Sequence, residues 1–135
     1  MIVDASVVLK WVILEDGSDA ARQLVSEETL AAPDLLFIEC ANLLAMKSRR
    51  GLISPDDARA AFDAIEATPI RSIPTRNLTT SALLIATELQ ATAYDSLYLA
   101  AAVAERTILL TADLAFARAA AARPDYSGAV RLLGA

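Results

Sequence analysis

The chain has 135 residues, the length of one domain, and 56% of them are hydrophobic, which is ample for a single buried core. One cysteine, Cys40, excludes an intramolecular disulfide and a cysteine zinc cluster, and the absence of histidine excludes a Ser-His-Asp triad. The formal net charge of −5, from 12 basic and 17 acidic residues, argues against a protein that simply coats nucleic acid.

The sequence shows no membrane or secretion signal. Its longest uninterrupted apolar run, 97–104, is far shorter than the roughly 18 residues of a membrane-spanning helix. The first residues, Met1 to Asp4, lack the basic region that opens a signal peptide. We therefore expect a cytoplasmic protein that makes no contact with a membrane.

The first half of the chain alternates short strand patterns with helical ones. The expected elements are a strand at 2–3, helices over 6–14 and 18–28, a weak strand at 30–32, and a helix over 35–50. Ser54-Pro55-Asp56-Asp57 then combines a capping residue, a proline in the first turn and an acid at the third position. These features predict the start of another helix.

The second half continues the alternation. It predicts a strand at 70–73, a helical face over 82–89, a helix over 95–105, a strand at 107–111, a helix over 112–122 and an edge strand at 130–133. Strands that alternate with helices indicate an α/β fold, a parallel sheet of about four to five strands flanked by helices on both faces. No linker or repeat interrupts the pattern, so we expect a single domain over residues 1–135.

Two acids follow predicted strands at the positions where parallel sheets bind ligands. Asp4 comes directly after the first strand, and Asp113 comes two residues after the strand that ends at Thr111. Ligands of an open parallel sheet bind outside the carboxyl ends of its strands. Taken singly, each acid is better explained as the N-cap of the helix that follows than as a ligand.

Two further acids occupy helical faces that are otherwise apolar. Glu39 shares a face with Leu36, Cys40 and Leu43, so its carboxylate stands either in the core or at the rim of the apolar stripe. Asp95 shares a face with apolar residues of the helix expected over 95–105. Alternatively, Asp95 is the N-cap of that helix. Buried charges are rare unless they are paired or bind a metal.

Together the four acids, Asp4, Glu39, Asp95 and Asp113, predict one site that binds a divalent cation. The basic residues of the Glu39 helix, among them Lys47, lie at its far end, and a cation would relieve the repulsion between clustered carboxylates. Oxygen-only ligands favour Mg²⁺, with Mn²⁺ as the alternative. The hydroxyls of Ser6 and Thr111 would orient a metal-bound water, unless they serve only helix capping and strand formation.

These motifs resemble the PIN-domain family, specifically VapC-type toxins of toxin–antitoxin pairs. The matching segments are MIVDASVVLKWV, the E-x-x-N pattern that starts at Glu39, TAYDSLYLAAAVAE and LLTAD. The resemblance implies a magnesium-dependent endoribonuclease, usually dimeric, that a cognate antitoxin protein inhibits. It also implies that Asp4, Glu39, Asp95 and Asp113 are the catalytic, metal-binding acids, with Ser6 and Thr111 as accompanying hydroxyls.

The implied chemistry is metal-assisted hydrolysis of RNA phosphodiester bonds by one or two ions. Two alternatives remain at this point: a phosphoryl-accepting receiver or phosphatase-like domain, and a PIN-like interaction module without catalysis. A receiver would have adjacent acids after its first strand, where Ala5 stands, and a phosphatase would have an acid in place of Ser6. We also expect an antitoxin with a basic segment for the acidic pocket and an amphipathic helix for a groove near Trp11 and Leu14.

Overall fold

A computed structural model describes residues 1–13 and 16–134 and shows one sheet of five parallel strands in the order β3-β2-β1-β4-β5. The strands are β1 (Ile2–Val3), β2 (Leu30–Pro33), β3 (Ile70–Ile73), β4 (Leu109–Thr111) and β5 (Val130–Leu132). The predicted α/β class and parallel sheet are therefore confirmed.

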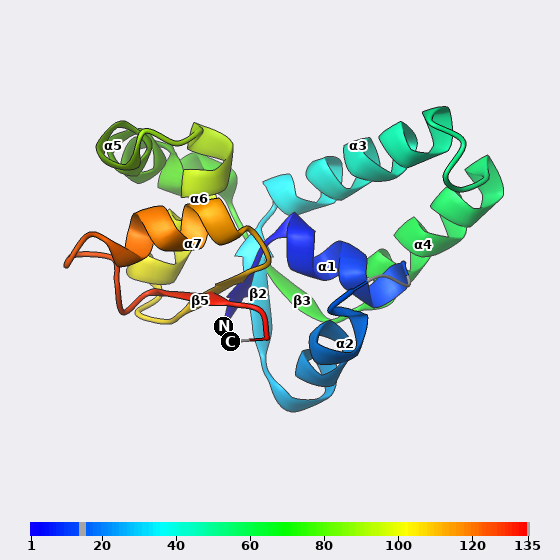
Figure 1. Ribbon diagram of the computed structural model, residues 1–135, viewed down its shortest axis with the longest axis horizontal. Helices are drawn as coiled ribbons and strands as arrows, with labels where there is room; N and C mark the ends of the chain where they lie inside the picture. The colour runs from blue at the N-terminus through cyan, green and yellow to red at the C-terminus, as the bar shows by residue number, and fades with distance from the viewer. Residues whose placement is uncertain (14–15, 135) are drawn as a thin grey trace.

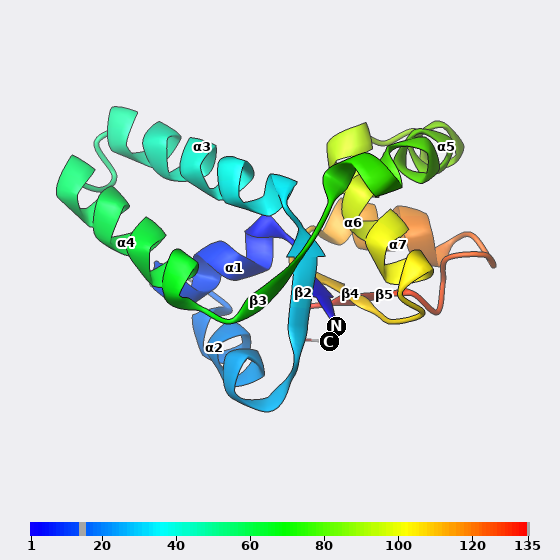
Figure 2. The same ribbon diagram turned by 180° about the vertical axis from the view of Figure 1, so that it is seen from behind.

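Helices cover both faces of the sheet (Figures 1 and 2). They are α1 (Ala5–Val12), α2 (Ser18–Glu27), α3 (Leu35–Arg49), α4 (Pro55–Ala67), α5 (Thr79–Leu89), α6 (Ala93–Ala104) and α7 (Leu114–Ala121), with a 3₁₀ turn η1 (Thr75–Leu78). Helices α1 to α4 lie on one side and α5 to α7 on the other. No helix in the described residues is long and apolar enough to cross a membrane.

The strand order explains this division of the helices. From β1 to β2 to β3 the chain moves toward one edge of the sheet, and from β3 it returns past two strands to β4 and then β5. Because crossovers between parallel strands are right-handed, the reversal sends the later helices to the opposite face. Strands β1 and β4 pair with each other, but the chain leaves them toward opposite faces of the sheet, so a crevice is expected at their carboxyl ends.

Helix α6 forms the centre of the core on its face of the sheet. Its residues from Ser96 to Ala102 are all buried, and the helix contacts β1, β2 and β4. On the opposite face, α1 buries Val7 and Val8, and α3 buries Leu36 and Cys40. This burial fixes the start of each helix relative to the strand ends, which positions the site described below.

Among the boundaries that differ from the sequence prediction, those of α6 and β4 have a clear physical cause. Helix α6 begins at Ala93, because the Thr92 side chain caps it by accepting a hydrogen bond from the Asp95 backbone N–H at 3.1 Å. The N-cap alternative for Asp95 is therefore wrong. Strand β4 begins at Leu109 because a turn with Arg106 at φ 53° separates it from α6.

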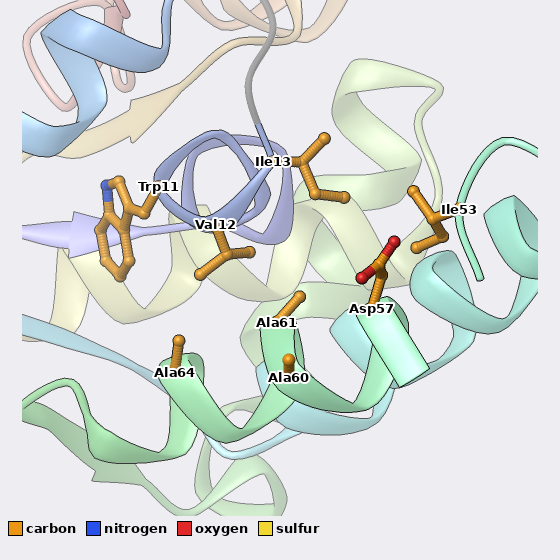
Figure 3. A pocket seen from close by; sticks show the side chains of 8 residues that line it. All are labelled: Trp11, Val12, Ile13, Ile53, Asp57, Ala60, Ala61 and Ala64. Atoms are coloured by element: carbon orange, nitrogen blue, oxygen red, sulfur yellow. The ribbon is translucent and has the colours of Figure 1, made fainter. Parts of the chain in front are cut away.

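Helices α3 and α4 form a hairpin that extends away from the sheet (Figures 1 and 2). Helix α1 packs against both of them. A groove of about 480 Å³ lies between α1 and α4, lined by Trp11, Val12, Ile13, Ile53, Asp57, Ala60, Ala61 and Ala64 (Figure 3). A groove is thus present near Trp11, its use by a partner stays a prediction, and Leu14 lies outside the described residues.

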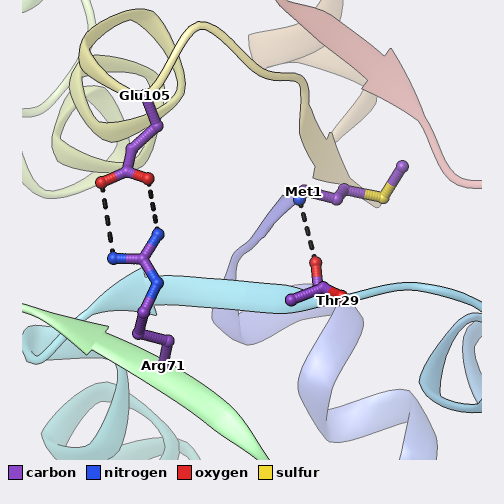
Figure 4. Close-up of polar contacts among 4 residues, drawn as sticks. All are labelled: Met1, Thr29, Arg71 and Glu105. Carbon is purple, nitrogen blue, oxygen red and sulfur yellow. Dashed lines mark hydrogen bonds and ion pairs between the residues drawn. The ribbon is translucent and has the colours of Figure 1, made fainter.

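Polar contacts connect the other end of the sheet (Figure 4). The Met1 amino group donates to the Thr29 carbonyl at 3.0 Å, just before β2 begins. Arg71 on β3 forms an ion pair with Glu105 at the C-terminal end of α6. Both side chains of this pair are partly or largely exposed, so it contributes little to stability.

Candidate active site at the carboxyl ends of the strands

Asp4 lies at the centre of a hydrogen-bond network that joins β1 to β4. Its Oδ1 accepts from the Ser6 hydroxyl at 2.5 Å and from the Val7 backbone N–H at 3.2 Å. Its Oδ2 accepts from the Thr111 hydroxyl. Asp4 therefore caps α1 and is also held from the neighbouring strand, so the capping and functional interpretations are compatible.

The two hydroxyls of this network are fixed in turn by the loop after β4. Ser6 Oγ accepts from the Ala112 backbone N–H, and Thr111 Oγ1 accepts from the Asp113 backbone N–H, each at 3.0 Å. Each hydroxyl has a single proton to donate, and both hydroxyls donate it to Asp4. In the structure Ser6 and Thr111 thus position the Asp4 carboxylate, and their orientation of a metal-bound water stays a prediction.

Glu39 lies in the second turn of α3, at the rim of the buried stripe formed by Leu36, Cys40 and Leu44. Its carboxylate is partly buried, and Oε1 accepts a hydrogen bond from the Tyr98 hydroxyl at 2.7 Å. Tyr98 itself is buried in α6. This contact joins α3 to α6 at the same end of the sheet, although the two residues are 59 positions apart in sequence.

Asp95 and Asp113 approach this end of the sheet from the other face. Asp95 lies in the first turn of α6, which runs antiparallel to β4 and therefore begins near the carboxyl ends of the strands. Asp113 caps α7 through Oδ1, which accepts from the Phe116 backbone N–H at 3.0 Å. The two acids line one hollow of about 190 Å³, and Glu39 lines a separate hollow.

The four carboxylates are close enough to influence one another electrostatically. Burial raises the pKa of Asp4, Glu39 and Asp95 above their ordinary values, against the lowering effect of their hydrogen bonds. The charge of Asp95 further raises the pKa of Asp4 and of Glu39, and the charge of Asp113 further raises the pKa of Asp95. Like charges are therefore concentrated at the carboxyl ends of β1 and β4, and this group of four acids is called the acidic crevice below.

No ion pair within the described part of the chain involves any of these four acids. Among the described residues, the ion pairs Arg59–Asp63, Arg71–Glu105 and Arg123–Glu88 include none of the four. The basic residues at the end of α3 include Arg49, ten residues beyond Glu39, or about 15 Å along the helix axis. Lys47 and Arg50 flank Arg49, so this basic group lies at the tip of the hairpin.

The donor set suits a hard divalent cation, since it consists of carboxylate oxygens. Asp4 Oδ2 accepts one hydrogen bond and Asp113 caps through Oδ1 alone, so both acids retain acceptor capacity for a ligand. Within residues 1–13 and 16–134, however, no three acidic or cysteine side chains already stand together as a complete metal-binding group. A cation would thus have to draw the acids closer together.

The family model for the PIN domain matches residues 1–122 of the chain, almost its whole length. The chain belongs to the PIN-domain family. This PIN domain is 34% identical over 114 residues to VapC ribonuclease Mb0985 of Mycobacterium bovis and to ribonuclease VapC9 of Mycobacterium tuberculosis. The alignments cover 84% of the chain and 86% of each relative.

Solved structures share the fold of this PIN domain. PAE2754 from Pyrobaculum aerophilum superposes with a TM-score of 0.71 at 22% identity, over 96% of this chain and 81% of that chain. VapBC2 from Rickettsia felis, bound to a DNA fragment from its promoter, superposes with a TM-score of 0.68 at 15% identity, over 97% and 96%. At these identities the similarity concerns the fold.

Two contributors to the site were not identified as such from the sequence. Tyr98 was recognised only as a member of the Asp95 face, yet its hydroxyl donates to Glu39. Thr92 caps α6 and so sets the position of Asp95. The Thr-x-x-Asp spacing of residues 92–95 is a capping-box pattern and could have revealed Thr92, whereas nothing local links Tyr98 to Glu39.

Proposed function

We propose that this PIN domain is a magnesium-dependent endoribonuclease and the toxin component of a toxin–antitoxin pair. The observation that carries the proposal is the group of four acids at the carboxyl ends of β1 and β4, where Asp4 is held by Ser6 and Thr111 and no ion pair among the described residues compensates the charge. The identity to relatives named VapC ribonucleases supports RNA as the substrate.

In this proposal Asp4 and Asp113 are the central ligands of Mg²⁺, with Mn²⁺ as a substitute, and Glu39 and Asp95 complete the site directly or through water. A bound ion supplies Lewis-acid stabilisation of the phosphate and lowers the pKa of the attacking water. The chain's own contribution is orientation. Ser6 and Thr111 fix both oxygens of Asp4, and Tyr98 fixes one oxygen of Glu39.

The test is cleavage of single-stranded RNA by the purified protein, with Mg²⁺ or with EDTA. We expect Mg²⁺-dependent cleavage, and a loss of about 100-fold or more in Asp4→Asn, since even residues that only support metal ligands cost about 10–100-fold. Asp19→Asn, an exposed acid on α2, is the matched control and should retain activity.

Three outcomes of this experiment would contradict the proposal, each in favour of a different alternative. Cleavage that persists in EDTA or in Asp4→Asn would reject the acidic crevice as the active site. A wild-type protein that neither cleaves RNA nor responds to Mg²⁺ would favour the interaction module without catalysis. Transfer of phosphate onto the protein would favour the receiver or phosphatase alternative.

The partner in this proposal is an antitoxin protein, which is consistent with the fold shared with the VapBC2 complex. Its amphipathic helix would occupy the groove between α1 and α4, where apolar side chains surround the single acid Asp57 (Figure 3). A basic partner is favoured because the chain carries a net charge of −5. We also propose that the toxin forms a homodimer, which light scattering in solution would test.

A further inference from the structure

A hollow of about 330 Å³ lies beside the acidic crevice, between α3 and the start of α6. It is lined by Leu35, Ile38, Glu39, Asn42 and Tyr94. Glu39 thus belongs both to the proposed metal site and to a largely apolar recess. Any group that fills this recess must lie next to the bond that the acids would act on.

Tyr94 gives this hollow an accessible aromatic ring. Its side chain is 65% exposed, although the neighbouring residues of α6 from Ser96 onward are buried. It immediately precedes Asp95, so the ring and a proposed metal ligand are fixed by the same capped turn. Leu35 and Tyr94 also line a second, smaller hollow, which makes the ring part of a continuous apolar surface.

Asn42 supplies a polar group at the rim of the same hollow. It lies three residues after Glu39 on α3, and therefore on the same side of the helix. Its side chain is exposed and makes no hydrogen bond with any described residue. The amide offers donors and an acceptor in one plane, the combination with which asparagine reads the edge of a nucleobase.

We infer that this hollow binds the nucleobase next to the cleaved phosphodiester, with Tyr94 stacking on the base and Asn42 hydrogen-bonding to its edge. The inference rests on the proposed ribonuclease function. A free base face and edge are available only in single-stranded RNA, so Tyr94 and Asn42 restrict the enzyme to unpaired segments. They are substrate-positioning residues, and the acidic crevice acts on the adjoining phosphate.

The test measures binding and cleavage of a fluorescent single-stranded RNA with Mg²⁺. In the Asp4→Asn background, which disables cleavage, Tyr94→Ala should weaken binding about 5- to 150-fold, the range for loss of one base–aromatic stack. Tyr94→Phe keeps the ring and should bind like the parent. Leu52→Ala removes another apolar side chain that is 65% exposed but lies between α3 and α4, and should also bind like the parent.

A second measurement ties the effect to one base. An RNA with an abasic nucleotide beside the cleavage site should bind as weakly to the parent as intact RNA binds to Tyr94→Ala, and the two losses should not add. With Asp4 intact, cleavage rates are compared for RNAs that differ only in the base at that nucleotide. Asn42→Ala should reduce the ratio between these rates more than it reduces the cleavage rate of the RNA that the wild type prefers.

The outcomes separate this inference from the function it rests on. Normal binding by Tyr94→Ala, in an enzyme whose wild type cleaves RNA, overturns the base site and leaves the ribonuclease intact. A change of oligomeric state in Tyr94→Ala with unchanged RNA affinity would assign the hollow to a second copy of the chain. Absence of both RNA binding and cleavage by the wild type would overturn the proposed function and the base site together.

Discussion

Asp4 shows how one carboxylate can serve both local structure and the proposed chemistry. Considered alone in the sequence, it is better explained as the cap of the following helix than as a ligand. The structure confirms the cap through Val7 and adds hydrogen bonds from Ser6 and Thr111, which hold the same carboxylate at the crevice. Asp113 likewise caps α7 through one oxygen. A capping acid is therefore not excluded as a metal ligand, because each carboxylate has two oxygens.

Ser96 is a residue where the fold leaves a polar group unsatisfied. It is fully buried in α6, and its hydroxyl has no hydrogen-bond partner among residues 1–13 and 16–134. We expect Ser96→Ala to raise the free energy of unfolding by about 1 kcal/mol or more, since a buried, unpaired polar group costs about 1–3 kcal/mol. Urea unfolding, followed by circular dichroism, measures this change.

The matched control is Ser81→Ala on α5, where the serine is exposed. Both substitutions gain the same helix propensity, so the difference between them isolates the buried hydroxyl. RNA cleavage should be unaffected by either change. If Ser96→Ala lowered stability below that of the wild type, the hydroxyl would have a structural role that the described contacts do not reveal.

At the scale of elements, helix starts determine where the acids lie. Thr92 caps α6 three residues before Asp95, so Asp95 lies inside the first turn instead of capping it. On the opposite face, α1 and α4 leave a groove because the alanines of α4 are too small to fill the space against Trp11 and Val12 (Figure 3). This groove is a consequence of residue size on two neighbouring helices.

The groove gives a prediction for the antitoxin. Ala64→Lys places a long cationic side chain in the groove, where it should repel a basic amphipathic helix and weaken the complex at least about tenfold, or about 1.4 kcal/mol. Titration of the co-encoded antitoxin by calorimetry measures the affinity. Lysine favours helix formation, so α4 should remain folded.

Ala67→Lys, at the end of the same helix but outside the groove lining, is the control and should bind the antitoxin normally. Both variants should cleave RNA like the wild type when the antitoxin is absent. Equal affinity of the two variants for the antitoxin would show that the partner binds elsewhere.

At the scale of the whole molecule, the acidic crevice makes stability depend on pH and on Mg²⁺. The pKa values of Asp4, Glu39 and Asp95 are raised in the folded state, so the native protein binds protons more readily than the unfolded chain. The stabilising effect of protonation is complete below the unfolded pKa values, about 4, and is lost as pH rises through the folded ones. These groups should therefore make the metal-free protein more stable at about pH 5.5 than at about pH 8.

Urea unfolding in EDTA at the two pH values measures this difference, which should be smaller in Asp4→Asn. At neutral pH, Mg²⁺ should raise the melting temperature of the wild type, since a ligand present at 100 times its Kd stabilises a native state by about 2.7 kcal/mol. Asp19→Asn should respond like the wild type, and Asp4→Asn should respond less. A melting temperature that millimolar Mg²⁺ does not change would contradict the proposed metal site.

The sequence by itself determined the fold class and the candidate acids. The strand pattern before Asp4 and the strand that ends at Thr111 depend on contiguous residues, and so do the helix start at Ser54 and the apolar faces of α3 and α6. Local periodicity and capping chemistry report such features directly. The parallel sheet followed from the alternation of strands and helices, and the family resemblance was confirmed by the match to the PIN-domain model.

Only the tertiary structure decided how the acids are held. The hydrogen bond from Thr111 to Asp4 spans 107 positions, and the bond from Tyr98 to Glu39 spans 59. Both exist because β1 pairs with β4 and α6 crosses the sheet, which no local pattern specifies. The hollow at Tyr94 has the same origin, since it forms where α3 and α6 meet. Sequence identifies which groups are available, and chain topology determines which of them become neighbours.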